Sequence, residues 1–279
     1  MKYENIYQSE EHFSFGRNWS DFQKRKLDES SIKEAEKSLL DFFDGHVDVR
    51  GKSFLDVGSG SGLFSLAATR LGVSNVVSTD VDEWSVRCTD EVRTKYAPQA
   101  KWQVRHASVL DREQMSSLGQ FDVVYSWGVL HHTGEMWQAI ENTGHLVRPG
   151  GWFYLALYNT SNSWLEGTSV FWVLAKRHYN RVGQMHKRVY KWLYVGYMIC
   201  GLASHGINPI RYIKNYTSLR GMDYFTDIED WLGGDPYEHA TVEEVEEYLK
   251  TLGFDLVKTK KARNIGCNEF LFRKFVASS

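Results

Sequence analysis

The stretch that most constrains the fold is residues 53–62, Ser-Phe-Leu-Asp-Val-Gly-Ser-Gly-Ser-Gly. Its first half, Ser53–Val57, is an apolar run with one acid and predicts a buried parallel strand. Three glycines follow at alternate positions, and a helical pattern of apolar residues begins near Ser61 and stops at Gly72. A strand, a glycine turn and a helix form the nucleotide-binding half of a doubly wound α/β fold, because glycine permits a tight turn and lets a ligand approach the backbone.

The spacing of the glycines narrows the class of ligand. Counted from Gly58, a dinucleotide fingerprint needs a small residue at position 63, where this chain has Leu63. The third glycine is Gly62 instead, and the chain contains no G-x-x-x-x-G-K-[ST] phosphate loop. A dehydrogenase is therefore disfavoured.

An acid follows the second predicted strand, Asn75–Thr79. Asp80 stands 24 residues after Asp56, and its two oxygens can accept hydrogen bonds from both hydroxyls of a ribose. The alternatives are an ordinary turn acid at this position and Asp82 in the ribose-binding role. The neighbouring Val81 is also expected to contact the cofactor.

Two further strands, 101–105 and 121–126, end in segments with polar side chains. Ser108 and Val109 follow the first, where an adenine would lie, with Asp111 as an alternative acceptor. The second is followed by Trp127-Gly-Val-Leu-His-His-Thr, across the crevice from the glycine loop. His131 and His132 are therefore candidates for a general base, although a buried structural histidine is the alternative.

Along the chain the motifs occur in this order: FLDVGSGSG, the acid after the second strand, FDVVYSWGVLHHT, and VRPGG before the apolar strand 152–158. Over roughly residues 50–160 the chain resembles the class I S-adenosylmethionine (SAM) methyltransferases, most of all those acting on quinols, small metabolites and cell-surface sugars. The resemblance implies a doubly wound, Rossmann-like α/β fold with a seven-stranded, mostly parallel sheet. It also implies that Gly58, Gly60 and Gly62 border the methionine part of SAM, that Asp80 holds the ribose, and that Ser108–Val109 flank the adenine. The family often has Asp where this chain has Ser108. The full set of expected cofactor contacts is Asp56, Gly58, Ser59, Gly60, Gly62, Asp80, Val81, Ser108, Val109, Trp127, Trp19 and Arg17.

Composition excludes some partners. The 279 residues carry a net charge of −2, which disfavours nucleic acid, and DNA is not expected. Three widely spaced cysteines and no apolar leader indicate a cytoplasmic protein, and no metal-ligand pattern is visible.

Three segments flank or interrupt the core, 49–158. Residues 1–48 are expected to form an arm and a helix capped by Ser30 or Ser31. In this arm Arg17 and Trp19 either cover the cofactor or pack on the domain. Residues 159–240 predict a helical cap inserted after strand five, and residues 241–279 a helix and the last two strands.

The cap contains a basic cluster over residues 176–191 and an apolar stretch, 192–203, too short to span a bilayer. A solvated basic face, a site for an anionic substrate, a peripheral membrane contact and a dimer surface are the alternatives. Residues 228–238 predict a loop whose Asp230, Trp231, Tyr237 and Glu238 can contact substrate.

The expected function is SAM-dependent methyl transfer to a hydroxyl of a small molecule or glycan. The general base is His131 or His132, with Glu238 and Asp230 as rivals. The alternatives are N-methylation of a small amine, RNA methylation through residues 176–191, and a non-catalytic SAM-binding protein. The chain has Ser126-Trp-Gly-Val where amino-group methylases carry Asn-Pro-Pro-aromatic, which disfavours base N-methylation.

Overall fold

The computed structural model describes residues 27–161, 168–220, 224–262 and 266–276. The expected lid residues Arg17 and Trp19 lie outside these ranges. The predicted seven-stranded, mostly parallel sheet is confirmed, with the order β3-β2-β1-β4-β5-β7-β6. β7 runs antiparallel to both of its neighbours, β5 and β6. The strands are β1 (Ser53–Val57), β2 (Asn75–Asp80), β3 (Trp102–His106), β4 (Phe121–Trp127), β5 (Val147–Tyr158), β6 (Phe254–Lys260) and β7 (Cys267–Lys274).

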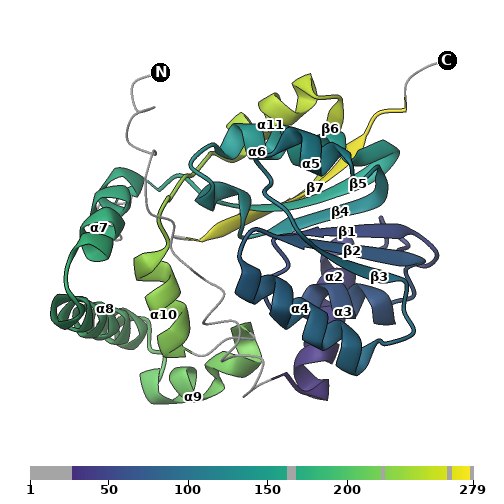
Figure 1. Cartoon of the computed structure of the whole chain (residues 1–279). Coiled ribbons are helices and arrows are strands. Elements are labelled where there is room, and N and C mark those ends of the chain that lie inside the picture. Colours follow the sequence, from purple (N-terminus) through teal and green to yellow (C-terminus); the bar gives the residue numbers. More distant parts are fainter. Residues whose placement is uncertain (1–26, 162–167, 221–223, 263–265, 277–279) are drawn as a thin grey trace.

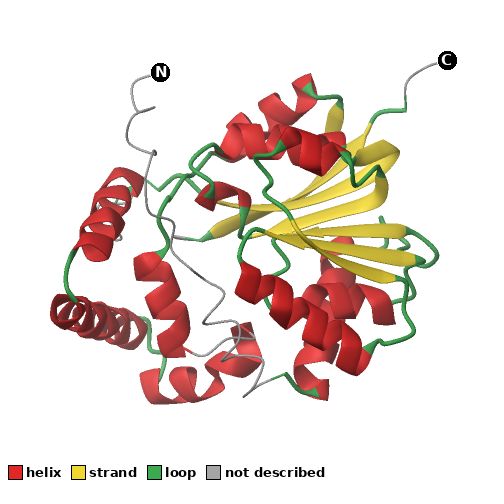
Figure 2. Cartoon of the chain, viewed as in Figure 1, coloured by secondary structure: helices red, strands yellow, loops and turns green. Residues whose placement is uncertain are grey.

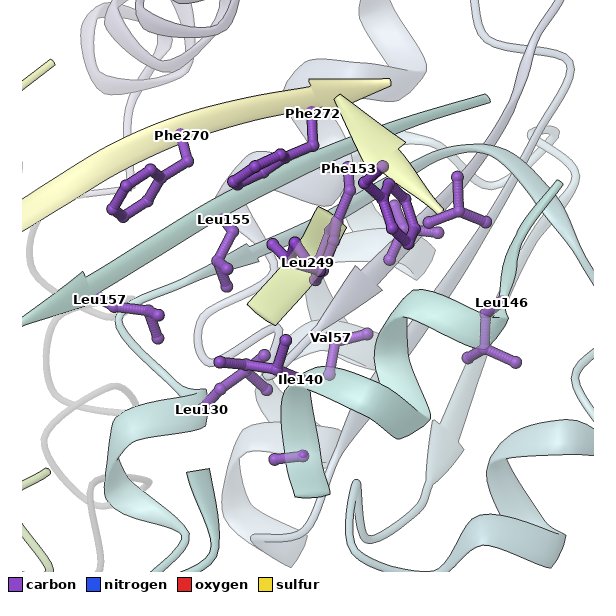
Figure 3. Packing of buried hydrophobic residues seen from close by; sticks show 14 of the residues in the cluster. Val57, Leu130, Ile140, Leu146, Phe153, Leu155, Leu157, Leu249, Phe270 and Phe272 are labelled. Carbon is purple, nitrogen blue, oxygen red and sulfur yellow. The ribbon is translucent and has the colours of Figure 1, made fainter. Parts of the chain in front are cut away.

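Helices cover both faces of the sheet (Figure 2). One face packs against α2 (Glu29–Phe43), α3 (Leu63–Arg70) and α4 (Glu83–Tyr96). The other packs against α5 (Arg112–Ser116), α6 (Met136–His145) and α11 (Val242–Thr251). Figure 3 shows the second core, in which side chains of β5 and β7 meet those of the helices. Because both faces are covered, the central strands β1 and β4 and the second half of β5 are mostly buried.

The ligand crevice of such a sheet lies where the strand order reverses, outside the carboxyl ends of the strands. Here the reversal falls between β1 and β4, which are neighbours although β2 and β3 separate them in the chain. The glycine loop after β1 and the short 3-10 helix Leu130–His132 after β4 therefore face each other.

The described residues between β5 and α11 form four helices: α7 (Ser169–Arg181), α8 (Gln184–Ser204), α9 (Pro209–Arg220) and α10 (Tyr224–Gly233). They stand off the carboxyl ends of β4 and β5 (Figure 1). They share an aromatic core of their own, which includes Trp172, Tyr179, Tyr224 and Tyr237. Among the described residues, no helix is both long enough and apolar enough to cross a bilayer.

Three local predictions were wrong. Asp28 caps α2 in place of Ser30 or Ser31, because its carboxylate accepts the amide of Ser31 at 2.8 Å. The predicted strand 152–158 begins earlier, since residues 148–151 also belong to β5, where a register shift between Phe121 and Val123 of β4 accommodates the extra residues. The predicted loop at 228–238 is helical up to Gly233, since the tertiary contacts of the cap core override its turn-forming residues.

Candidate active site

The glycine loop is tightly packed against both sides of the crevice. Gly58 and Gly62 have φ angles of +77°, which L-residues rarely adopt. A Cβ on Gly58 would lie 2.3 Å from Cγ2 of Val129, in the segment that follows β4. A Cβ on Gly62 would lie 2.9 Å from the Cα of Thr89 in α4. The buried Ser59 hydroxyl forms a hydrogen bond of 2.9 Å with the hydroxyl of the same Thr89. Because this side chain points to α4, the backbone of the loop faces the crevice.

Asp80 closes the loop from the end of β2. Its Oδ2 accepts the amide of Gly60 at 3.0 Å, and its Oδ1 accepts the amide of Asp82 at 2.9 Å. Burial raises the pKa of Asp80 to about 6, against the lowering effect of these amides. Asp82, the rival for the ribose role, instead caps α4 by accepting the amides of Trp84 and Ser85. The carboxylate of Asp80 is therefore the one that both shapes the loop and lies at the crevice.

Asp56 lies beneath the loop. It is 1% exposed, and its carboxylate accepts the hydroxyl of Ser65 in α3 at 2.5 Å. Burial raises its pKa to about 7, and the nearby charge of Asp80 acts in the same direction. The side chain holds β1 to α3 and supports the loop from inside.

Exposed apolar side chains gather around the strand ends. Val81, Trp84 and Trp127 are 63%, 46% and 43% exposed, and they follow or end β2 and β4. Large exposed apolar groups of this kind are what an adenine ring and a thioether would cover. Ser108 and Val109 follow β3. The Ser108 hydroxyl accepts the amide of Leu110 at 3.3 Å, and the Val109 carbonyl accepts the side chain of Asn142 at 2.9 Å.

The two histidines differ in their environment. His131 is fully buried, and its Nδ1 accepts the amide of Tyr158 at 3.3 Å, which places its proton on Nε2. Burial lowers the pKa of His131 well below its usual value, so the ring is neutral. The half-buried His132 has Nδ1 2.7 Å from the carbonyl of Pro236. A carbonyl only accepts, so Nδ1 carries the proton and Nε2 carries the lone pair.

The rivals for the role of base are more enclosed. Glu238 is 7% exposed, its amide donates to the carbonyl of His131 at 2.9 Å, and its Oε1 accepts the amide of Met136 at 3.0 Å. Burial raises its pKa to about 7. Asp230 is 8% exposed and lies on α10. The structure thus brings Glu238 against the histidine segment and joins the cap to the core there.

Sequence reasoning missed the role of Lys176. Its side chain is 1% exposed, although it belongs to the predicted basic cluster. The ammonium lies 3.8 Å from the ring centroid of Trp231 and 4.8 Å from that of Tyr237, and it donates to the carbonyl of Trp231. Burial lowers its pKa to about 7. The expectation of a wholly solvated basic face is therefore wrong at this position.

A signal for this burial is present in the sequence. Trp172, Val173, Lys176 and Tyr179 recur at i, i+1, i+4 and i+7, and all four are buried. Helical spacing places Lys176 on the apolar face of α7.

The sequence analysis also missed Tyr158, at the end of β5. Its ring centroid lies 4.0 Å from that of His131 and 4.8 Å from that of Tyr237, so it joins the histidines to the cap.

We expect Gly58→Ala to lower both stability and cofactor affinity. The new methyl group would overlap Val129, which we expect to cost about 2–3 kcal/mol in the free energy of unfolding. Gly119→Ala is the matched control, because Gly119 has a φ of +82° and open space around it. Thermal unfolding of Gly58→Ala with and without Val129→Ala isolates the overlap. Equal destabilisation at Gly58 and Gly119 would contradict the packing argument.

The residues present fit SAM. The glycines let the loop backbone pass close to Val129 and Thr89, Asp80 offers two carboxylate oxygens beside the loop, and exposed apolar side chains follow the neighbouring strand ends. Among the described residues, no three His, Cys, Asp or Glu side chains are grouped to hold a metal ion. Fold and loop together define a Rossmann-like domain that binds an adenosine-containing cofactor at its switch point.

Comparison with known proteins identifies the family. A profile described as "Methyltransferase domain" matches residues 27–196, more than half of the chain. The chain therefore belongs to the class I SAM-dependent methyltransferases and is an enzyme of this class. The resemblance to the class I SAM-dependent methyltransferases that the motifs indicated is confirmed.

Individual relatives match a little under half of the chain. The rRNA N(6)-adenosine-methyltransferase metl-5 of Caenorhabditis elegans is 28% identical over 134 residues, 46% of this chain and 62% of that protein. The ubiquinone biosynthesis O-methyltransferase of Neisseria meningitidis serogroup C is 29% identical over 120 residues, 43% of this chain and 50% of that protein. The similarity thus spans between half and two thirds of each relative.

Solved structures share the fold. An O-methyltransferase family protein from Burkholderia thailandensis has a TM-score of 0.58 at 11% identity, covering 98% of this chain and 67% of its own. The magnesium protoporphyrin IX methyltransferase of Synechocystis PCC 6803, solved with bound SAH, has a TM-score of 0.51 at 13% identity, covering 98% and 93%. At these identities the likeness shows the fold.

Proposed function

We propose that this enzyme transfers a methyl group to a hydroxyl oxygen of a small-molecule or glycan acceptor, with His132 as the general base. The observation that carries the proposal is the bond between Nδ1 of His132 and the Pro236 carbonyl, 2.7 Å long. It fixes the tautomer in which Nε2 can take a proton. A hydroxyl must lose its proton to become a good nucleophile, whereas the free base of an amine is already nucleophilic.

The position of His132 relative to the cofactor site supports the role. Its amide donates to the carbonyl of Val129 at 2.9 Å, and Val129 packs on the Gly58 position of the loop. The base is therefore one short turn away from the wall of the proposed SAM site. Glu238 is the second candidate, because a pKa of about 7 suits a base, although Met136 already occupies one of its oxygens.

In the proposed site each part of SAM has a partner. The backbone of residues 58–62 would border the amino acid end, Asp80 the ribose, and Val81, Trp84 and Trp127 the apolar parts. When bound, SAM supplies an electrophilic methyl on a sulfonium. The chain aligns the acceptor and excludes water, and alignment of this kind is worth about 7–11 kcal/mol in favourable cases. His132 removes the hydroxyl proton.

The acceptor atom is tested by product analysis. We expect the enzyme, given SAM with an isotopically labelled methyl group, to label phenol, quinol or sugar hydroxyls from a panel that also holds amines and an RNA. The label should appear as an O-methyl group by mass spectrometry and NMR. Label found only on nitrogen, or only on RNA, would contradict the proposal and favour the N-methylation seen in the name of the C. elegans relative.

A further inference from the structure

Helix α8 carries an exposed apolar stripe along its length. Met185, Val189, Trp192 and Leu193 are 77%, 55%, 61% and 65% exposed. They stand at i, i+4, i+7 and i+8, so they share one face of the helix, which Gly196 and Cys200 continue. Val195, which is buried, lies on the face turned toward the rest of the cap. An amphipathic helix normally turns its apolar face to the core, and here this face points outward.

The stripe is part of a larger apolar surface. Of the nineteen exposed large hydrophobic residues in the described chain, eleven lie between residues 170 and 210. Besides α8, they stand on α7, where Phe171 and Leu174 are 55% and 57% exposed, and on α9, where Ile210 is 68% exposed. These helices form the side of the molecule away from the sheet (Figure 1). Apolar surface this concentrated marks an interaction site.

The same segment is strongly basic. Residues 167–222 contain nine Lys and Arg, of which Lys176 is buried, and no Asp or Glu, in a chain whose net charge is −2. Arg188 is exposed beside the α8 stripe, and Arg181, Arg211 and Lys214 are exposed on the neighbouring helices. The partner of this surface must therefore be negatively charged and must also accept apolar side chains.

We propose that helices α7–α9 dock on the surface of an anionic lipid bilayer. Helix α8 lies in the interface with Trp192 and Leu193 entering the boundary between headgroups and acyl chains, and the arginines meet lipid phosphates. A second copy of this chain fits less well, because it would bring two acid-free basic surfaces together. RNA fits the charge but leaves the aliphatic side chains exposed.

The test is flotation of the purified full-length protein with vesicles of phosphatidylcholine, with and without phosphatidylglycerol. We expect flotation with the anionic vesicles alone, and less of it at high salt. The triple variant M185Q/V189Q/L193Q should lower the partition coefficient by about tenfold or more, since it removes three of the four apolar side chains of the exposed stripe. Arg188→Gln should lower it by about fivefold, the effect of one basic residue at an anionic surface.

Leu40→Gln is the matched control, because Leu40 is 48% exposed on α2, outside helices α7–α9. It should float as the unchanged protein does, and the triple variant should keep its SAH affinity and its unfolding temperature. Equal flotation of the triple variant, or no flotation with anionic vesicles, would overturn the proposal. A dimer in sedimentation that the triple variant loses and the Leu40→Gln control keeps would also overturn the proposal. Salt-sensitive RNA binding without flotation would overturn it as well.

Discussion

Asp80→Ala is expected to weaken SAH binding by about a hundredfold, because it removes two charge-assisted hydrogen bonds to the ribose. It also removes the acceptor for the amide of Gly60, which loosens the loop that borders the amino acid end. Calorimetric titration measures the affinity. Asp90→Ala, at an exposed carboxylate on α4, is the control and should leave the affinity unchanged. An Asp80→Ala variant that folds and binds SAH as the unchanged protein does would exclude the ribose role.

The pH dependence of SAH affinity distinguishes the charge of the Asp80 carboxylate from the shape of its side chain. Its pKa is raised to about 6, so SAH affinity should fall as pH drops through 6. Asp80→Asn should bind weakly and show no such dependence, because its amide group faces the backbone donors.

The free energy of unfolding of the ligand-free protein has the opposite dependence on pH. The folded state holds the proton up to about pH 6 and the unfolded chain only to about 4, so the contribution of Asp80 is lost as pH rises between these values.

His132→Ala is expected to lower kcat by about 10²–10⁴-fold, the usual contribution of a positioned general base. SAH affinity should change less than about twofold, because the imidazole serves the acceptor hydroxyl. The acid limb of the pH–rate profile, where protonation removes the lone pair, should disappear with the side chain.

Glu238→Gln distinguishes the two candidate bases. The amide keeps an oxygen for the Met136 amide and can no longer take a proton. If His132 is the base, this variant should lose only a few-fold in turnover. A large loss in Glu238→Gln together with near-normal turnover in His132→Ala would exchange the two roles.

The core of the fold was predictable because its signals are local. The glycine triplet, the acid after β2 and the histidines after β4 each follow a strand, and parallel strands bring their carboxyl ends to one edge. The structure places Gly58 against Val129 and Asp80 against Gly60, which agrees with that inference.

The cap was less predictable because its contacts are long-range. The burial of Lys176 depends on Trp231, 55 residues away, and residues 228–233 are helical within the cap core although Gly233 favours a turn. The hydrogen bond from the amide of Met136 to the side chain of Glu238 joins residues that are 102 positions apart in the sequence. No local pattern encodes such pairings, although the i, i+1, i+4, i+7 spacing around Lys176 indicates its side of the helix.

The central claim is that one site joins the glycine loop, Asp80 and His132. The most direct test is a crystal structure of the full-length protein with SAH. We expect the ribose hydroxyls within hydrogen-bond distance of the Asp80 carboxylate and the sulfur directed toward the side of the crevice that holds Nε2 of His132. SAH bound with its ribose away from Asp80, or with its sulfur directed away from His132, would contradict the account.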